Sequence, residues 1–97
     1  MTAAGRTRFK FRLYVADTTE NSDAARSNLA AICQDYLPGR HLIEVVDVLE
    51  DPDRALDDRI LVTPTLLKVW PLPVRRIVGN LSQTPAVLLA IGIEGTP

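Results

Sequence analysis

The stretch from Ile60 to Val78, ILVTPTLLKVWPLPVRRIV, decides the fold. Residues 66–70 and 74–78, which are rich in apolar and β-branched side chains, flank the turn Pro71-Leu72-Pro73, a pattern that predicts two antiparallel strands in a hairpin. Thr63-Pro64-Thr65 places a proline directly before the first of these strands. The stretch therefore predicts two paired strands. A proline precedes the first strand, and a turn with two prolines connects it to the second.

The residues before this stretch predict a strand, a helix and another strand. Phe9 to Val15 alternates apolar and polar side chains, which is typical of a strand with one buried face. Asn21 or Ser22 can cap a helix that carries apolar residues at helical spacing and ends at Pro38-Gly39. His41 to Leu49 is an almost unbroken apolar run, which indicates a strand packed on both faces. Strands joined by a helix in this way are expected to be parallel.

Two further helices complete the pattern. Asp51-Pro52 opens a short helix that runs to about Asp58, with Ala55 and Leu56 expected to face inward. Thr84-Pro85 opens the last helix, because Thr84 can cap it and proline fits the first turn. The order βαβαββα predicts an α/β protein with a thioredoxin-like fold, in which a four-stranded mixed sheet carries helices on both faces.

The composition fits one small soluble domain of 97 residues, with 46% hydrophobic and 24% charged residues. We expect this domain to span residues 8–94, between flexible termini at 1–7 and 95–97. A net charge of −1 gives no general attraction to nucleic acid or anionic lipid. No apolar run has the length of a membrane span, and no signal peptide opens the chain. A cytoplasmic location is expected, since a single cysteine forms no internal disulfide.

The sequence offers no catalytic constellation. A redox enzyme of the thioredoxin type needs a cysteine at the start of its first helix, and residues 16–22, ADTTENS, hold none. Cys33 shares a helix face with Leu29, which indicates a core residue. His41 is expected to be solvated at a strand end, and the aspartates between 51 and 58 to form a solvated helix face. We therefore predict that the protein is not an enzyme and holds no metal or cofactor.

Several stretches carry a resemblance to a known family. They are Leu13-Tyr14-Val15-Ala16, Asn21-Ser22, Val46-Asp47-Val48-Leu49, Asp51-Pro52, Ile60–Leu66, Pro71–Gly79 and Leu81-Ser82. The most specific is Pro71–Gly79, PLPVRRIVG. In their order and spacing, these stretches make the chain similar to KaiB of the bacterial circadian clock from about residue 9 to residue 93.

The resemblance implies a protein that acts by binding. KaiB proteins dock on the N-terminal ATPase ring of KaiC, and in the clock the complex also captures KaiA and competes with a sensor histidine kinase. The implied function is an adaptor that binds a KaiC-type hexameric ATPase and modulates its activity or signalling, in a clock or in a clock-like timing or stress response. The resemblance also implies a homo-oligomer, dimer or tetramer, as one form of the protein.

The same resemblance, together with the residue types, gives the candidate partner-binding residues. They are Trp70, Pro71, Pro73, Arg75, Arg76 and Glu44. Arg75 and Arg76 can pair with acidic groups of a partner, although neighbouring strand residues face opposite sides. Trp70 belongs to the residue type most enriched at binding hot spots. Glu44 stands where the family commonly has lysine, on a strand expected at a sheet edge whose backbone is free to pair.

Three further positions are expected to serve the structure. Pro64 lies where thioredoxin-like domains commonly hold a cis proline, and Gly79 breaks the last strand. Ala90 stands where the family usually has glycine. KaiB proteins also adopt a ground-state fold with a rearranged C-terminal half, and alanine favours the helical form over glycine by about 1 kcal/mol. We therefore expect the thioredoxin-like form to be well populated without a partner.

An alternative hypothesis is that the protein is a degenerate redox protein of the thioredoxin superfamily. The missing cysteine pair favours the adaptor.

Overall fold

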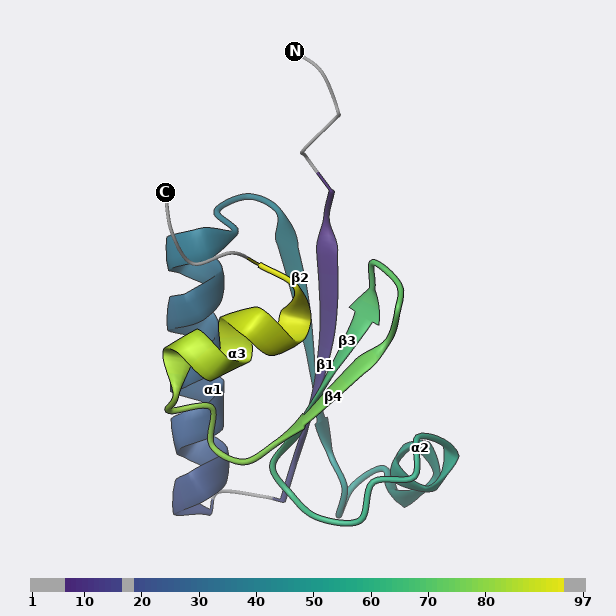
Figure 1. The fold of residues 1–97 in the computed structure, drawn as a ribbon. Coiled ribbons are helices and arrows are strands. Elements are labelled where there is room, and N and C mark those ends of the chain that lie inside the picture. The colour runs from purple at the N-terminus through teal and green to yellow at the C-terminus, as the bar shows by residue number, and fades with distance from the viewer. Residues whose placement is uncertain (1–6, 17–18, 94–97) are drawn as a thin grey trace.

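The computed structural model describes residues 7–16 and 19–93 (Figure 1). The elements follow in the order β1 (Phe9–Val15), α1 (Glu20–Tyr36), β2 (His41–Asp47), α2 (Pro52–Asp57), β3 (Thr65–Trp70), β4 (Arg75–Val78) and α3 (Thr84–Ile91). The segments predicted as flexible termini, 1–7 and 95–97, lie outside the described residues except for Thr7.

The strands form one mixed sheet in the order β2-β1-β3-β4. β1 pairs in parallel with β2 and antiparallel with β3, and β3 forms an antiparallel hairpin with β4. α1 and α3 cover one face of the sheet, whereas α2 lies against one end of the other face (Figure 1). The predicted α/β thioredoxin-like fold is confirmed, with β2 at an edge of the sheet.

The sheet has a hydrophobic core on each face, and β1 supplies side chains to both because successive residues of a strand point to opposite faces. The larger core holds Phe9, Phe11, Leu13 and Val15, packed with residues of α1 and α3. Tyr14 points the other way and joins a smaller core with Val46, Ala55 and Leu67. Cys33 is buried in the larger core, as its spacing predicted.

The start of α1 differs from the prediction. Thr19 is the N-cap residue, and its Oγ1 accepts a hydrogen bond of 3.2 Å from the Ser22 backbone. The prediction of Asn21 or Ser22 is wrong because Ser22 is buried inside the first turn, where its Oγ accepts a hydrogen bond from Ala16. Thr19 thereby satisfies one of the free N–H groups that every helix start leaves.

The burial of β2 also differs from the prediction of a strand packed on both faces. Val46 is buried, but the side chains of Leu42 and Val45 are 54% and 46% exposed. β2 has a neighbour on one side only. Leu42 lies on the face of the six-residue α2, which is too short to cover the strand along its length, whereas Val45 lies opposite Leu13 on the other face, at the edge of the larger core. An apolar run therefore indicated a buried strand where the tertiary structure leaves an exposed edge.

α2 buries only one of the two side chains that were predicted to face inward. Ala55 is buried against the smaller core, whereas Leu56 is 74% exposed. Successive helical residues are rotated by about 100°, so a helix of six residues presents few side chains to the sheet. Asp51 occupies the N-cap position, as predicted, but its side chain makes no capping hydrogen bond.

α3 begins one residue earlier than predicted, because Gln83 rather than Thr84 precedes its first turn. Gly92 ends the helix with φ = 89°, a left-handed conformation that glycine adopts without strain. The buried Lys68 donates from Nζ to the Ile91 carbonyl at 3.3 Å. A cation is favourable there because the carbonyl end of a helix carries partial negative charge.

Leu13→Ala is expected to lower the free energy of unfolding by about 2–5 kcal/mol, because Leu13 is fully buried and its truncation leaves a cavity. Urea unfolding measures the change. Leu89→Ala is the control: the Leu89 side chain is 81% exposed, and its loss should change stability by less than about 0.5 kcal/mol. Equal effects of the two substitutions would contradict this description of the core.

Ala90→Gly is expected to shift the population away from helical α3, towards the rearranged C-terminal half that the family resemblance implies. Glycine disfavours a helix interior by about 1 kcal/mol relative to alanine. NMR chemical shifts over residues 86–92 measure the change, from helical towards strand-like values. The control is Ala30→Gly, which makes the same change at an exposed position of α1 and should leave these shifts helical.

Candidate functional site

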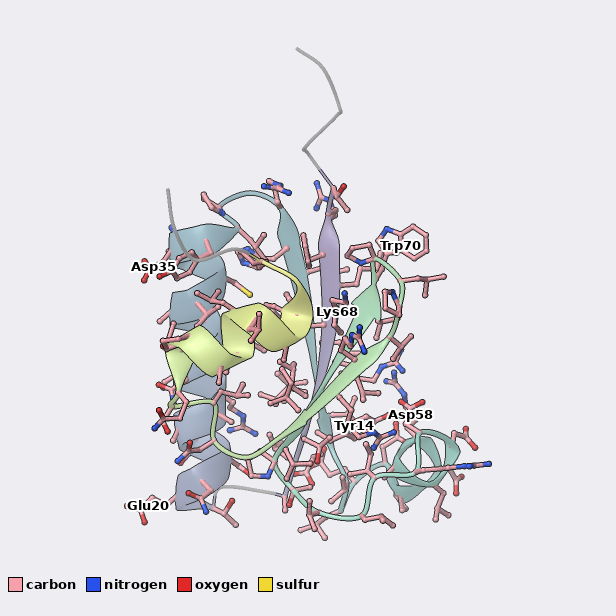
Figure 2. All side chains as sticks on the ribbon, in the orientation of Figure 1. Tyr14, Glu20, Asp35, Asp58, Lys68 and Trp70 are labelled. Atoms are coloured by element: carbon pink, nitrogen blue, oxygen red, sulfur yellow. The ribbon has the colours of Figure 1, made fainter. Side chains whose placement is uncertain are left out.

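The end of the β3–β4 hairpin gathers most of the predicted partner-binding residues. Trp70 ends β3 with its side chain 48% exposed, and Figure 2 shows it at the outer end of the hairpin. Pro71 and Pro73 form the turn, each after a cis peptide bond. Leu72 and Val74 are also exposed. We call residues 70–75 the hairpin tip: an exposed apolar surface that ends at the exposed Arg75.

Arg75 and Arg76 face opposite sides of the sheet, as the strand spacing predicted. In the strand register, Arg75 lies opposite Lys68 on the face of the larger core, and Arg76 lies opposite Leu67 on the face of the smaller core. The Arg76 guanidinium donates to the Asp58 carbonyl at 2.6 Å and to the Arg59 carbonyl at 3.1 Å. Arg76 therefore fastens β4 to the segment that follows α2. Its two internal bonds join parts of the chain that are distant in sequence, so the sequence pattern could not reveal them.

Glu44 lies away from the hairpin tip, on the edge strand β2. Its carboxylate accepts hydrogen bonds from Arg54 Nη2 at 2.9 Å and from Arg12 Nε at 3.1 Å, and so links β2 to α2 and β1. The hydrogen bond from Arg54 is the largest cause that lowers the pKa of Glu44 to about 2. Glu44 therefore lies apart from the other predicted partner-binding residues, and its carboxylate is bound within the chain by Arg12 and Arg54.

Asp58 is the second carboxylate of this network, and the prediction of a solvated helix face is wrong for this aspartate, because it follows α2 and is bound by side chains of β1. The Tyr14 hydroxyl donates to Asp58 Oδ2, and Arg12 Nη1 donates to the same oxygen at 2.9 Å. Although burial opposes its ionisation, these hydrogen bonds lower the pKa of Asp58. Burial is the main cause that raises the pKa of Tyr14 to about 12. We call Arg12, Tyr14, Glu44, Arg54 and Asp58 the polar network.

Two of the three residues predicted to serve the structure, Pro64 and Gly79, lie close to the start of β3. Pro64 is buried and follows a cis peptide bond, the conformation expected from its place in the fold. Its carbonyl accepts a 2.9 Å hydrogen bond from Gly79, the residue after β4. Gly79 has φ = 121°, a conformation that side chains disfavour. Ala90 lies apart from these two residues, in the last turn of α3.

Cys33 has the properties of a core residue. Burial raises the pKa of its thiol to about 11, so the thiolate that redox exchange requires is scarce at neutral pH. Its side chain packs in the larger core, far along α1 from the start of the helix.

The described residues show neither a metal-binding cluster nor a membrane-spanning helix. Over 7–16 and 19–93, no group of three or more His, Cys, Asp or Glu side chains is arranged to hold a metal ion. In the same part of the chain, every helix is too short or too polar to cross a membrane.

Comparison with known proteins agrees with the fold and the hairpin motif. The family model of the KaiB domain matches residues 12–93. The chain belongs to the KaiB family. This KaiB-family chain is 43% identical over 86 residues to circadian clock protein KaiB3 of Synechocystis sp., which covers 89% of the chain and 84% of the relative. It is 46% identical over 82 residues to the circadian clock oscillator protein KaiB of Synechococcus elongatus, covering 84% and 80% of the two chains.

Solved structures agree on the fold. The N-terminal domain of SasA from Synechococcus elongatus superposes with a TM-score of 0.68 at 22% identity, covering 94% of this chain and 90% of that one. Mitochondrial thioredoxin 3 from Saccharomyces cerevisiae gives a TM-score of 0.71 at 18% identity, covering 89% and 78%. The KaiB-family chain therefore has the thioredoxin fold, and its sequence relatives are circadian clock proteins.

Glu44→Gln is expected to lower the free energy of unfolding by about 1 kcal/mol or less at neutral pH, because ion pairs of a half-exposed carboxylate are screened by water. The folded-state pKa lies below the ordinary 4.5, so the stabilisation is present above that pH and disappears as the pH falls towards 2. Urea unfolding across this range measures the difference between the two proteins.

Glu50→Gln is the control, because Glu50 is exposed and has no ion pair among the described residues. A gap between wild type and Glu44→Gln that is constant with pH would contradict the role given to the polar network.

Proposed function

We propose that this protein is a non-enzymatic adaptor that binds a KaiC-type hexameric ATPase and modulates its activity or signalling. The observation that carries the proposal is the position of Pro71–Gly79, the stretch most specific to the KaiB resemblance: it forms the exposed turn and outer strand of the sheet. A sequence that is typical of a family and lies mostly on the surface is better explained by a binding role than by core packing.

The hairpin tip has the chemistry of a protein contact. Trp70, Leu72 and Val74 expose apolar surface at one place, and aromatic residues are enriched at the energetic centres of interfaces. Prolines at 71 and 73 restrict the backbone, so less conformational entropy is lost when the tip binds. Arg75 adds a cation that can pair with a carboxylate of the partner.

The two arginines have different roles in this proposal. Arg75 is exposed and makes no ion pair among the described residues, so it is available to a partner. Arg76 is a positioning residue, since its guanidinium holds the carbonyls of Asp58 and Arg59. It keeps β4, and with it the base of the hairpin tip, in a fixed place.

Further partners in the proposal bind elsewhere. β2 is an edge strand with exposed side chains on both faces, and its free backbone groups can pair with a strand of another protein. We assign this edge to a KaiA-like protein, whereas a sensor histidine kinase competes for the ATPase. Glu44 at this edge is committed to Arg12 and Arg54, so it contributes there by fixing the strand.

Size-exclusion chromatography with the cognate KaiC-type ATPase, with and without nucleotide, tests the proposal. We expect a complex with the wild-type chain. Arg75→Glu is expected to weaken the affinity roughly tenfold, about 1.4 kcal/mol, and to make binding less sensitive to salt. Its thermal unfolding should match that of wild type because Arg75 is exposed.

The control is Arg26→Glu, which makes the same charge change on α1, away from the hairpin. It should leave the affinity unchanged. If no complex forms under any nucleotide condition, the adaptor proposal fails; if both variants bind equally well, the hairpin tip is not the contact.

A further inference from the structure

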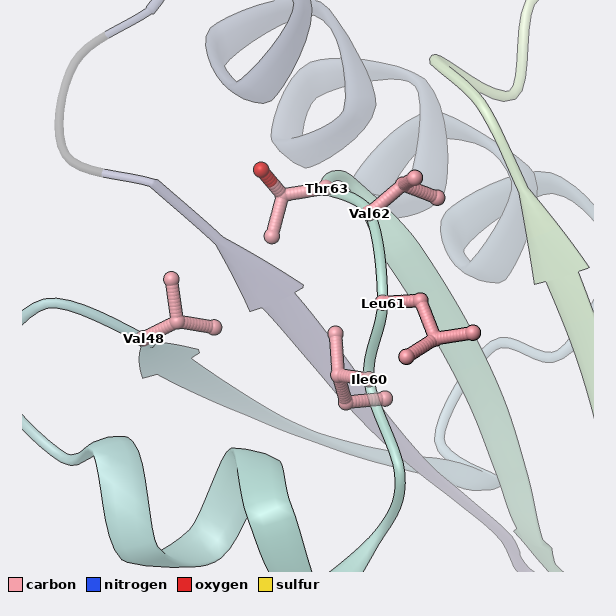
Figure 3. Close-up of a pocket in the computed structure, with 5 residues that line it drawn as sticks. All are labelled: Val48, Ile60, Leu61, Val62 and Thr63. Carbon is pink, nitrogen blue, oxygen red and sulfur yellow. The ribbon is translucent and has the colours of Figure 1, made fainter.

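A second exposed apolar surface lies between the end of β2 and the start of β3. A shallow hollow there is lined by Val48, Ile60, Leu61, Val62 and Thr63 (Figure 3). The side chains of Leu61 and Val62 are 92% and 52% exposed. Exposed apolar residues that cluster at a hollow and are flanked by polar residues mark interaction sites more often than isolated ones do.

The backbone beside this hollow has few hydrogen-bond partners among the described residues. No described residue accepts a hydrogen bond from the N–H groups of Leu61, Val62 or Thr63, and none donates to the carbonyls of Leu61 and Thr63. Thr65 Oγ1 donates to the Val62 carbonyl at 2.7 Å and holds the segment in place. An exposed segment with free donors and acceptors can pair with an extended chain.

The segment from Asp47 to Ile60, which includes α2 and joins two sides of the hollow, carries several carboxylates. Besides Asp58 of the polar network, its carboxylates are those of Asp47, Glu50, Asp51, Asp53 and Asp57. None of them forms an ion pair with a described residue. The base within the segment, Arg54, is committed to Glu44. Two bases lie next to the hollow: Arg59 is exposed, and Arg76 donates to the carbonyls of Asp58 and Arg59. The carboxylates of this segment outnumber these two bases, so this part of the chain is more negative than the net charge of −1 indicates.

We propose that the hollow and these carboxylates form a binding surface for an extended segment of another protein in which lysine or arginine alternates with apolar residues. Alternate side chains of such a segment point the same way, so the apolar ones can cover Leu61 and Val62 while the basic ones reach the carboxylates. The free backbone groups at residues 61–63 bind its main chain. Negative charge at this surface disfavours nucleic acid and anionic lipid as occupants.

This surface is separate from the hairpin tip. The tip follows the C-terminal end of β3, and the hollow precedes its N-terminal end, so the two lie at opposite ends of that strand. Binding at the hollow therefore succeeds or fails independently of the ATPase proposal.

Titration of the ¹⁵N-labelled protein with a short peptide that alternates lysine and valine tests this surface. We expect the largest chemical-shift changes at Val48 and at residues 60–63, and weaker binding as salt is added. A glutamate–valine peptide of the same length should not bind. Changes centred on β2 or on the hairpin tip, equal binding of the two peptides, or no binding of either would overturn the proposal.

Leu61→Ser is the matched variant, because a side chain that is 92% exposed can be replaced without loss of folding. It should weaken peptide binding several-fold, and so should Glu50→Gln combined with Asp57→Asn. Leu89→Ser makes the same change at an exposed position of α3 and should have no effect on peptide binding. If sedimentation shows that wild type self-associates and Leu61→Ser does not, the surface binds a second copy instead, and the proposed occupant is wrong.

Discussion

β1 pairs with a strand along both of its edges, and the rest of the structure depends on that position. Parallel bonds to β2 and antiparallel bonds to β3 leave this strand no free edge, while its alternating side chains enter both cores. The apolar side chains from Phe9 to Val15 hold α1 and α3 on one face. The hydroxyl of Tyr14 reaches Asp58 just beyond α2 on the other face. A change within β1 therefore acts on every layer of the molecule.

The two faces of the sheet are held by different forces. α1 and α3 bury a large apolar core, which is close-packed and needs few polar contacts. α2 is a single short helix with one buried side chain, Ala55, so apolar contact alone gives it little support. The polar network supplies the rest, since Arg12 and Arg54 bridge the carboxylates of Glu44 and Asp58. Arg76 extends this support to β4 through two backbone carbonyls.

This division leaves different surfaces for binding at the two ends of β3. At the hairpin tip, prolines and Trp70 present apolar surface beside a cation, where a KaiC-type partner is proposed to dock. At the other end, the exposed Leu61 and Val62 follow a segment whose carboxylates at 47, 50, 51, 53 and 57 form no ion pair with a described residue. The charges are opposite, so the two surfaces suit different partners, and the intervening strand gives them a fixed separation. The proposed adaptor would in this way contact two proteins through separate surfaces.

Local patterns were sufficient for the order of elements, the pairing of β3 with β4 through the proline turn, the buried position of Cys33 and the family, because each depends on residues that are close in the chain. The tertiary structure alone decided which apolar residues are covered. Leu42, Val45 and Leu56 look like core residues in sequence but are exposed, because β2 is an edge strand and the short α2 buries only Ala55. It also decided that Glu44 and Arg76, candidates for a partner, bind within the chain. Their internal partners, among them Arg12 for Glu44 and Asp58 for Arg76, are far away in sequence, and charge patterns along a chain do not specify which distant groups folding brings together.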